Sequence, residues 1–188
     1  MSQGQVKALD KHRPPEENLV VIDASGHIAG RLATVAAKLA LMGKRVIVVN
    51  AQDAVVTGDP NMVINWFKKR ITEIRTHYNP EKVGPKWPRR PDRVLRRIIR
   101  GMLPHKQYKG REALRRVKVY LGVPKEYFNA PKYIIPDAVL KPRPGIKYVT
   151  LGDVWRAIEP LKYEAWRRAY ERYLTEVNAP RQEAKPQQ

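Results

Sequence analysis

The chain has 188 residues, a formal net charge of +19 and no cysteine, which excludes disulfides, thiolate metal sites and cysteine nucleophiles. Its hydrophobic content of 43% is enough for one domain with a real core. The polar start and the absence of any run of about 20 apolar residues predict a soluble intracellular protein without a signal peptide or a membrane span.

The first half of the chain has the pattern of an α/β fold. Short runs rich in β-branched residues are typical of buried parallel strands. An amphipathic stretch between the first two runs is typical of the crossover helix of a right-handed βαβ unit. In chain order the sequence predicts a flexible segment at 1–18, a strand at 19–22, a helix at 28–42, strands at 46–49 and 54–57, and a helix from 59 to about 70.

The second half begins with a loop, 77–91, whose four prolines break all periodicity and whose length alone suggests a function. A helix follows, with an apolar face made of Val94, Leu95, Ile98, Ile99 and Met102. The predicted elements from there on are this helix at 92–103, a short helix at 109–116, a fourth strand at 117–121, an extended surface arm at 122–145, a helix opened by a capping box at 150–153, interrupted at Pro160 and resumed at 161–177, and a disordered tail at 178–188.

The positive charge is concentrated in one part of the chain. Between Lys68 and Lys118 there are eighteen Lys and Arg residues against four acids. A basic surface of this density repels itself unless a polyanion covers it, and the commonest such partner is the phosphate backbone of a nucleic acid. Anionic lipid is a weaker alternative, because no basic helix carries a bulky Trp, Phe or Leu face.

The most informative motif places arginine at i, i+3, i+4 and i+7 of one predicted helix, and this arginine stripe consists of Arg93, Arg96, Arg97 and Arg100. Like charges at such spacing destabilise a helix, and a solvated face, which is the plain alternative, usually mixes both signs. Arginine also suits bidentate contact with phosphate and stacking on bases. We therefore favour nucleic acid over simple solvation.

The loop before the stripe interleaves aromatic side chains, such as Tyr78 and Trp87, with lysines and arginines. Such mixtures stack on unpaired bases, which favours folded RNA over a DNA duplex. The alternative for Trp87, packing beneath its own loop, stays open. A DNA-binding protein is the third alternative. It is not favoured, because the sequence resembles no helix-turn-helix, zinc finger or basic zipper.

An enzyme is the alternative from a different class. The turn from Gly26 to Arg31 follows a strand and opens a helix, where dinucleotide enzymes place their Gly-rich turn. It lacks both the G-x-G-x-x-G and the G-K-[ST] pattern, so a nucleotide-dependent enzyme is not favoured. The scattered histidines form no complete catalytic set, and no cofactor, metal or small-molecule substrate is expected. A helix N-terminus still suits a phosphate, so Arg31 is expected to contact an RNA backbone.

Short motifs spread between Leu19 and Tyr127 point to one protein family. They are Val21-Ile22-Asp23-Ala24, Gly30-Arg31-Leu32-Ala33, Asn50-Ala51, Val56-Thr57-Gly58, Arg100-Gly101-Met102-Leu103-Pro104, and Val117-Lys118-Val119-Tyr120-Leu121-Gly122 after Leu114. Together they resemble the universal large-subunit ribosomal protein thirteen family, and Lys147-Tyr148-Val149-Thr150-Leu151 before a helix resembles its archaeal and eukaryotic branch.

The resemblance implies a three-layer α/β/α domain with a mostly parallel four-stranded sheet, which we place at 19–128, before an extended arm and C-terminal helices at 129–177. It implies a structural constituent of the large ribosomal subunit in the cytoplasm, which binds large-subunit rRNA, acts in assembly and catalyses nothing. Neighbouring large-subunit proteins are further expected partners. One candidate contact is the helix at 161–177, whose Tyr163, Trp166, Tyr170 and Tyr173 recur at roughly helical spacing, unless this aromatic stripe packs back on its own domain.

In this interpretation the apolar face of helix 92–103 docks on the sheet and the arginine stripe faces RNA phosphates. Gly101 is expected to serve close packing or a helix end before Pro104. The residues expected to contact rRNA are Arg31, Lys44, Arg45, Lys68, Lys69, Arg70, Arg75, His77, Lys82, Lys86, Trp87, Arg89, Arg90, Arg93, Arg96, Arg97, Arg100, His105, Lys106, Lys109, Arg111, Arg115, Arg116 and Lys118.

Overall fold

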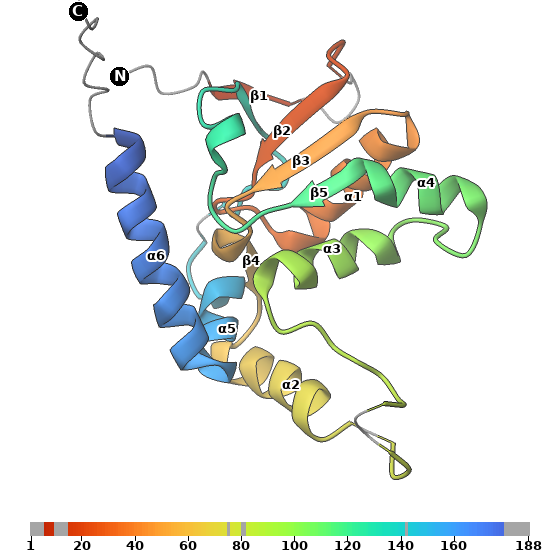
Figure 1. Cartoon of the computed structure of the whole chain (residues 1–188), viewed down its shortest axis with the longest axis vertical. Helices are drawn as coiled ribbons and strands as arrows, with labels where there is room; N and C mark the ends of the chain where they lie inside the picture. The colour runs from red at the N-terminus through yellow and green to blue at the C-terminus, as the bar shows by residue number, and fades with distance from the viewer. Residues whose placement is uncertain (1–5, 10–14, 75, 80–81, 142, 179–188) are drawn as a thin grey trace, which may run out of the picture.

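The computed structural model describes residues 6–9, 15–74, 76–79, 82–141 and 143–178. Its centre is a parallel sheet in the strand order β1-β6-β2-β3-β5 (Figure 1). The strands of this sheet are β1 (Val6–Ala8), β2 (Leu19–Asp23), β3 (Arg45–Val49), β5 (Val117–Val119) and β6 (Lys132–Ile134). The predicted α/β class with a mostly parallel sheet is confirmed, with five strands in place of the expected four.

The described part of the chain contains six α-helices. They are α1 (Ala29–Leu41), α2 (Pro60–Thr72), α3 (Pro91–Gly101), α4 (Tyr108–Arg116), α5 (Leu151–Ile158) and α6 (Pro160–Asn178). Each was expected from the sequence within a few residues. Asp59 caps α2 by accepting hydrogen bonds from the Asn61 and Met62 amides. Thr150 and Asp153 form the predicted capping box of α5. None of these helices is long and apolar enough to cross a membrane.

The two faces of the sheet bury different side chains because neighbours along a strand point to opposite faces. Val20 and Ile22 of β2 belong to the larger core, which α1 and α3 cover, and their neighbour Val21 belongs to a smaller one. The smaller core is closed by Val123 and by aromatic side chains around the short 3-10 helix η2 (Lys125–Tyr127). The short turn and the loop around it thus close this second face.

The predicted strand at 54–57 forms, but outside the main sheet. β4 (Val55–Thr57) pairs antiparallel with β7 (Tyr148–Thr150), which leads directly into α5. The 3-10 helix η1 (Ala51–Asp53) lies between β3 and β4, and Asn50 before it has a left-handed backbone with a φ of 55°. This turn carries the chain out of the sheet. The pair of β4 and β7 then joins the sheet to helices α2 and α5, which pack on each other below it (Figure 1).

The expectation of a surface arm at 122–145 is wrong. The segment contributes β6, which lies between β1 and β2, and Tyr133, Ile135 and Ala138 are buried in the larger core. β1 falls in the stretch 1–18 that was expected to be flexible, and pairs with the free edge of β6. The domain limits at 18, 128 and 177 stay predictions, and the predicted tail from 179 onward lies outside the described residues.

The aromatic stripe of α6 packs back on its own domain, as one of the two alternatives had it. Trp166 stacks on Tyr170, with 5.4 Å between ring centroids, and also contacts Trp155 of α5. The Tyr170 hydroxyl accepts a hydrogen bond from the Val123 amide, and the Tyr173 hydroxyl donates one to the Val123 carbonyl. α6 is therefore fastened to the loop after β5 by the side chains that could have formed an external stripe.

Candidate nucleic-acid interface

The centre of the candidate interface is α3, which has one buried and one basic face. Pro91 starts the helix, and Val94, Leu95 and Ile99 are buried against α1 and the sheet. On the opposite side three arginines of the stripe, at 93, 96 and 100, are exposed. Met102, which the sequence placed on the apolar face, is 48% exposed instead, because α3 ends at Gly101 and the helical spacing does not continue to residue 102.

Arg97 differs from the rest of the stripe. It is half-buried, its guanidinium carbon lies 3.9 Å from the centroid of the Trp87 ring, and it donates a hydrogen bond to the Lys86 carbonyl. Trp87 also meets Trp66 edge-on and lies under Arg70. These contacts favour the packing alternative for Trp87 over base stacking. Arg97 holds the loop against α3 through Lys86 and Trp87.

The loop that precedes α3 is tied to the protein close to the helix. Arg89 forms a 2.8 Å ion pair with Glu159, which stands between α5 and α6. Hydrogen bonds from Lys162 and then from Arg89 lower the pKa of the Glu159 carboxyl, against the opposing effect of burial. Arg90 pairs with Asp92 at 3.2 Å. Two of the predicted contacts, Arg89 and Arg90, are thus already neutralised within the chain.

Farther from α3, most of the cationic side chains of this loop and of α2 are exposed. Tyr78 is 86% exposed. The predicted contacts Lys68, Lys69, His77, Lys82 and Lys86 are exposed as well. Arg70 is half-buried over the Trp66 ring, at 4.5 Å from its centroid, and Arg75 lies outside the described residues.

After α3 the chain turns into α4 and presents a second group of cations. The predicted contacts Lys106, Lys109, Arg111, Arg115 and Lys118 are exposed, whereas His105 and Arg116 are half-buried. Arg115 pairs with Glu112 at 2.6 Å. In Figure 1 the loop, α3 and α4 follow one another along the same side of the molecule, so the structure brings most of the predicted set together.

Three predicted contacts are engaged or placed elsewhere. Arg31 at the start of α1 donates to the Asp137 carbonyl at 3.2 Å, and Lys44 donates to the Glu16 carbonyl at 2.9 Å. Arg45 is exposed at the start of β3. It lies near the end of α4, because its neighbour Val46 pairs with Val117, which directly follows α4.

Sequence reasoning missed one basic residue on this side. Lys38 of α1 and Lys109 of α4 line the same shallow hollow, together with Met42 and Met102. The helical spacing could have indicated Lys38, because it follows Arg31 by seven residues, about two turns, and so lies on the same exposed face of α1.

Gly101 was expected to serve close packing or a helix end, and the structure places it at the end of α3. A Cβ on Gly101 would meet nothing within 4 Å, so Gly101 makes no tight packing contact. A Cβ on Gly110 in α4 would overlap the Pro104 carbonyl. Gly110 therefore holds the sharp turn between α3 and α4, and with it the spacing of the two groups of cations.

The turn from Gly26 to Arg31, the basis of the enzyme alternative, is occupied by the chain itself. His27 is fully buried, and its Nε2 accepts the Ile135 amide at 3.0 Å, which leaves Nδ1 to donate to the Ser25 carbonyl at 2.9 Å. The Gly26 amide donates to the Asp53 carbonyl, and the Ile28 amide donates to the Ala138 carbonyl. These two amides of the turn are therefore not available to a dinucleotide phosphate.

Comparison with known proteins gives one consistent result. The model of a family described as ribosomal protein L13 matches residues 17–126. The chain is 56% identical to the large ribosomal subunit protein uL13 of Pyrobaculum islandicum, over 84% of this chain and 88% of the relative. It is 52% identical to the uL13 of Pyrobaculum aerophilum over 88% and 91%, and 45% identical to that of Archaeoglobus fulgidus over 74% and 87%.

Proposed function

We propose, from the premise that this chain belongs to the ribosomal protein L13 family, that its basic face is the surface that holds large-subunit rRNA. The basic face is defined as the exposed Arg93, Arg96, Arg100, Lys106, Lys109 and Arg111. As a member of this family, the chain is a structural constituent of the large ribosomal subunit in the cytoplasm and not an enzyme. Its partners there are rRNA and other ribosomal proteins.

The observation that carries the proposal is the state of three stripe arginines. Arg93, Arg96 and Arg100 are exposed and have no hydrogen bond or ion pair within the described part of the chain. Other arginines near them, such as Arg89 and Arg115, are paired with acids of the chain. Three guanidinium groups left together on one helix face repel one another, and phosphates that neutralise them release condensed counterions.

The other predicted contacts take secondary places in this proposal. The exposed lysines of α2 and the loop extend the basic face toward a second part of the rRNA. Arg70, Trp87, Arg89, Arg90 and Arg97 serve mainly to hold the loop in position, because their side chains already have partners. Arg31, Lys44 and Arg45 would meet RNA apart from the basic face. Protein contacts through α6 would use its outward charged side, since its aromatic side is occupied.

Binding to large-subunit rRNA fragments across a salt series tests the proposal. Replacing Arg93, Arg96 and Arg100 by Gln should lower the slope of log affinity against log salt by about 2 units, since each phosphate contact contributes roughly 0.7 to 0.9. The matched control replaces Arg167, Arg168 and Arg172 of α6 by Gln, which removes the same charge from another surface. Equal losses in both variants, or equal binding to duplex DNA, would contradict a specific rRNA surface.

A further inference from the structure

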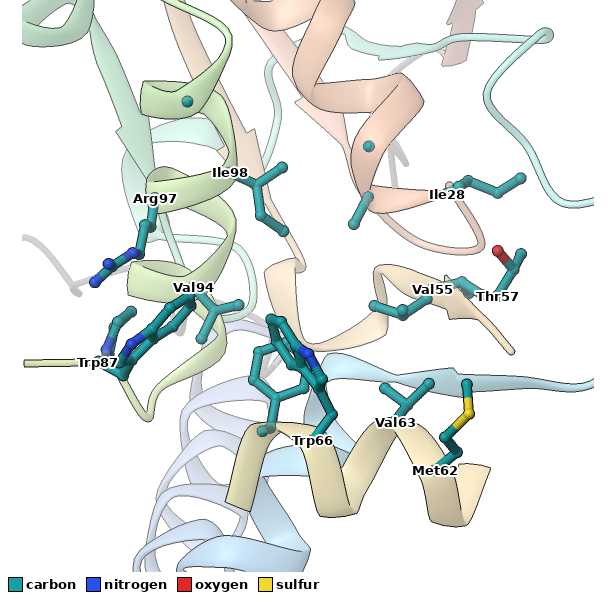
Figure 2. A pocket seen from close by; sticks show the side chains of 16 residues that line it. Ile28, Val55, Thr57, Met62, Val63, Trp66, Trp87, Val94, Arg97 and Ile98 are labelled. Atoms are coloured by element: carbon teal, nitrogen blue, oxygen red, sulfur yellow. The ribbon is translucent and has the colours of Figure 1, made fainter. Parts of the chain in front are cut away.

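An apolar groove with a volume of about 710 Å³ lies between α2, α3, β4 and the start of α1. Figure 2 shows Ile28, Val55, Val63, Val94 and Ile98 around it. Arg97 is the charged side chain among the residues that line it. The groove is therefore a hydrophobic surface whose charge is confined to one end.

The wall formed by α2 is more exposed than a folded core would leave it. Met62 is 66% exposed and Trp66 is 45% exposed. The two are one helical turn apart and adjoin Val63 and Phe67, which the fold buries. The apolar surface of α2 therefore extends beyond what its own domain covers, and contiguous exposed apolar surface of this kind usually marks an interface.

Two glycines keep the groove open. Gly30 of α1 and Gly101 of α3 both line it, and a Cβ on either would meet nothing within 4 Å. Neither has a positive φ. A glycine within a helix makes the helix less stable than an alanine would, by up to about 1 kcal/mol. The fold itself therefore does not require glycine at these two positions, and the space they leave is available to another molecule.

Aromatic rings hold two guanidinium groups at the charged end of the groove, Arg97 in its lining and Arg70 next to it. Arg97 lies over the Trp87 ring, and Arg70 lies 5.0 Å from the centroid of the same ring and 4.5 Å from that of Trp66. Neither arginine forms an ion pair within the described part of the chain. A guanidinium that is already oriented loses little entropy when it binds a carboxylate, and it can do so through two hydrogen bonds.

We propose that this groove binds a segment of a neighbouring large-subunit protein, with large apolar side chains in the groove and a carboxylate at Arg70 and Arg97. Recognition of this kind, apolar anchors in a groove between helices, is common between proteins. A nucleobase fits less well, because each polar edge atom left unpaired against an aliphatic wall costs roughly 1–3 kcal/mol. The inference goes beyond rRNA binding, which uses Arg93, Arg96 and Arg100.

Site-specific crosslinking in intact large subunits tests it. Met62 and, separately, Trp66 are replaced by the photoreactive p-benzoylphenylalanine, and the crosslinked partner is mapped by mass spectrometry. The expected product joins the groove to one protein segment that carries apolar residues beside Asp or Glu. Crosslinks to rRNA, to an apolar segment without acids, or to nothing from either position would overturn the proposal.

The two groove glycines supply the second arm of the test. Gly101→Leu and Gly30→Leu should each lower the yield of the Met62 crosslink at least about tenfold, as the loss of one anchored side chain does. Both variants should keep the melting temperature and the rRNA affinity of the parent. Ala165→Leu on the exposed side of α6 is the matched control. An unchanged yield in a folded glycine variant would overturn the proposal, whereas loss of rRNA affinity would assign the groove to RNA.

Discussion

Two regions differ in whether their polar side chains have partners inside the fold. They are the turn between β2 and α1 and the basic face on α3 and α4. At the turn, each polar atom of the His27 ring has a partner inside the fold. On α3, three arginines have none within the described residues. A buried polar group without a partner is costly, whereas an exposed one is not. The first region is therefore satisfied within the isolated chain, and the second is the surface that we propose a polyanion covers.

Gly110→Ala should give the largest loss of stability. It tests the point at which the basic face depends on packing in the interior. The added Cβ would overlap the Pro104 carbonyl, and relief requires the backbone between α3 and α4 to move. We expect a loss of about 3 kcal/mol or more in the free energy of unfolding, measured by urea denaturation. Gly101→Ala, also in a helix but facing open space, is the control and should be neutral or slightly stabilising. Equal effects at both positions would contradict this packing.

His27→Ala should come next. It leaves the Ile135 amide without its acceptor and opens a cavity under the turn. We expect a loss of about 2 to 3 kcal/mol, measured in the same way. His77→Ala, at an exposed position, should change stability by less than about 0.5 kcal/mol. A His27 variant as stable as the His77 variant would mean that this turn is not a closed interior region.

The same histidine should make stability depend on pH. Burial lowers the pKa of His27 below 6.5, against opposing effects of the Ser25 carbonyl and the Asp23 charge. The unfolded chain therefore binds this proton more readily, so stability is full above the unfolded pKa and falls as pH drops through 6.5 toward the folded pKa. The loss is about 1.4 kcal/mol for each unit of pKa difference. Melting temperatures between about pH 7.5 and pH 5.5 should fall more steeply for the parent than for His27→Gln.

The stripe variant should have the smallest effect on stability. Replacing Arg93, Arg96 and Arg100 by Gln removes like charges at helical spacing, so the free energy of unfolding should rise by a few tenths of a kcal/mol. Thermal denaturation at low salt measures this gain, which salt should reduce. A loss above about 1 kcal/mol would show that these arginines support the fold, and the contrast between the two regions would fail.

The sequence predicted the parts of the fold that depend on local patterns. β2, α1 and β3 are continuous apolar runs and an amphipathic helix, each with its own period. β6 was missed because its three residues carry little pattern, and its partners β1 and β2 lie far away in the chain. Pairing with distant strands, and not composition, makes this segment a strand.

Within the candidate site, the sequence found the arginines but not their different environments. Arg96 and Arg97 each lie about one helical turn from Arg93 and from Arg100, yet one is exposed and the other lies over Trp87. The difference arises from a loop that returns to the helix, which no periodicity records. For the same reason the motif drew attention to Gly101, whereas the turn depends on Gly110.

The position of β6 between β1 and β2 has a consequence for the order in which the protein forms. β1 precedes almost the whole domain in the chain, but its partner is a strand near residue 132. A chain made from its N-terminus can build β2, α1 and β3 early, while β1 has nothing to pair with until β6 has emerged and added to β2. β1 is therefore among the last of the described strands to find its place.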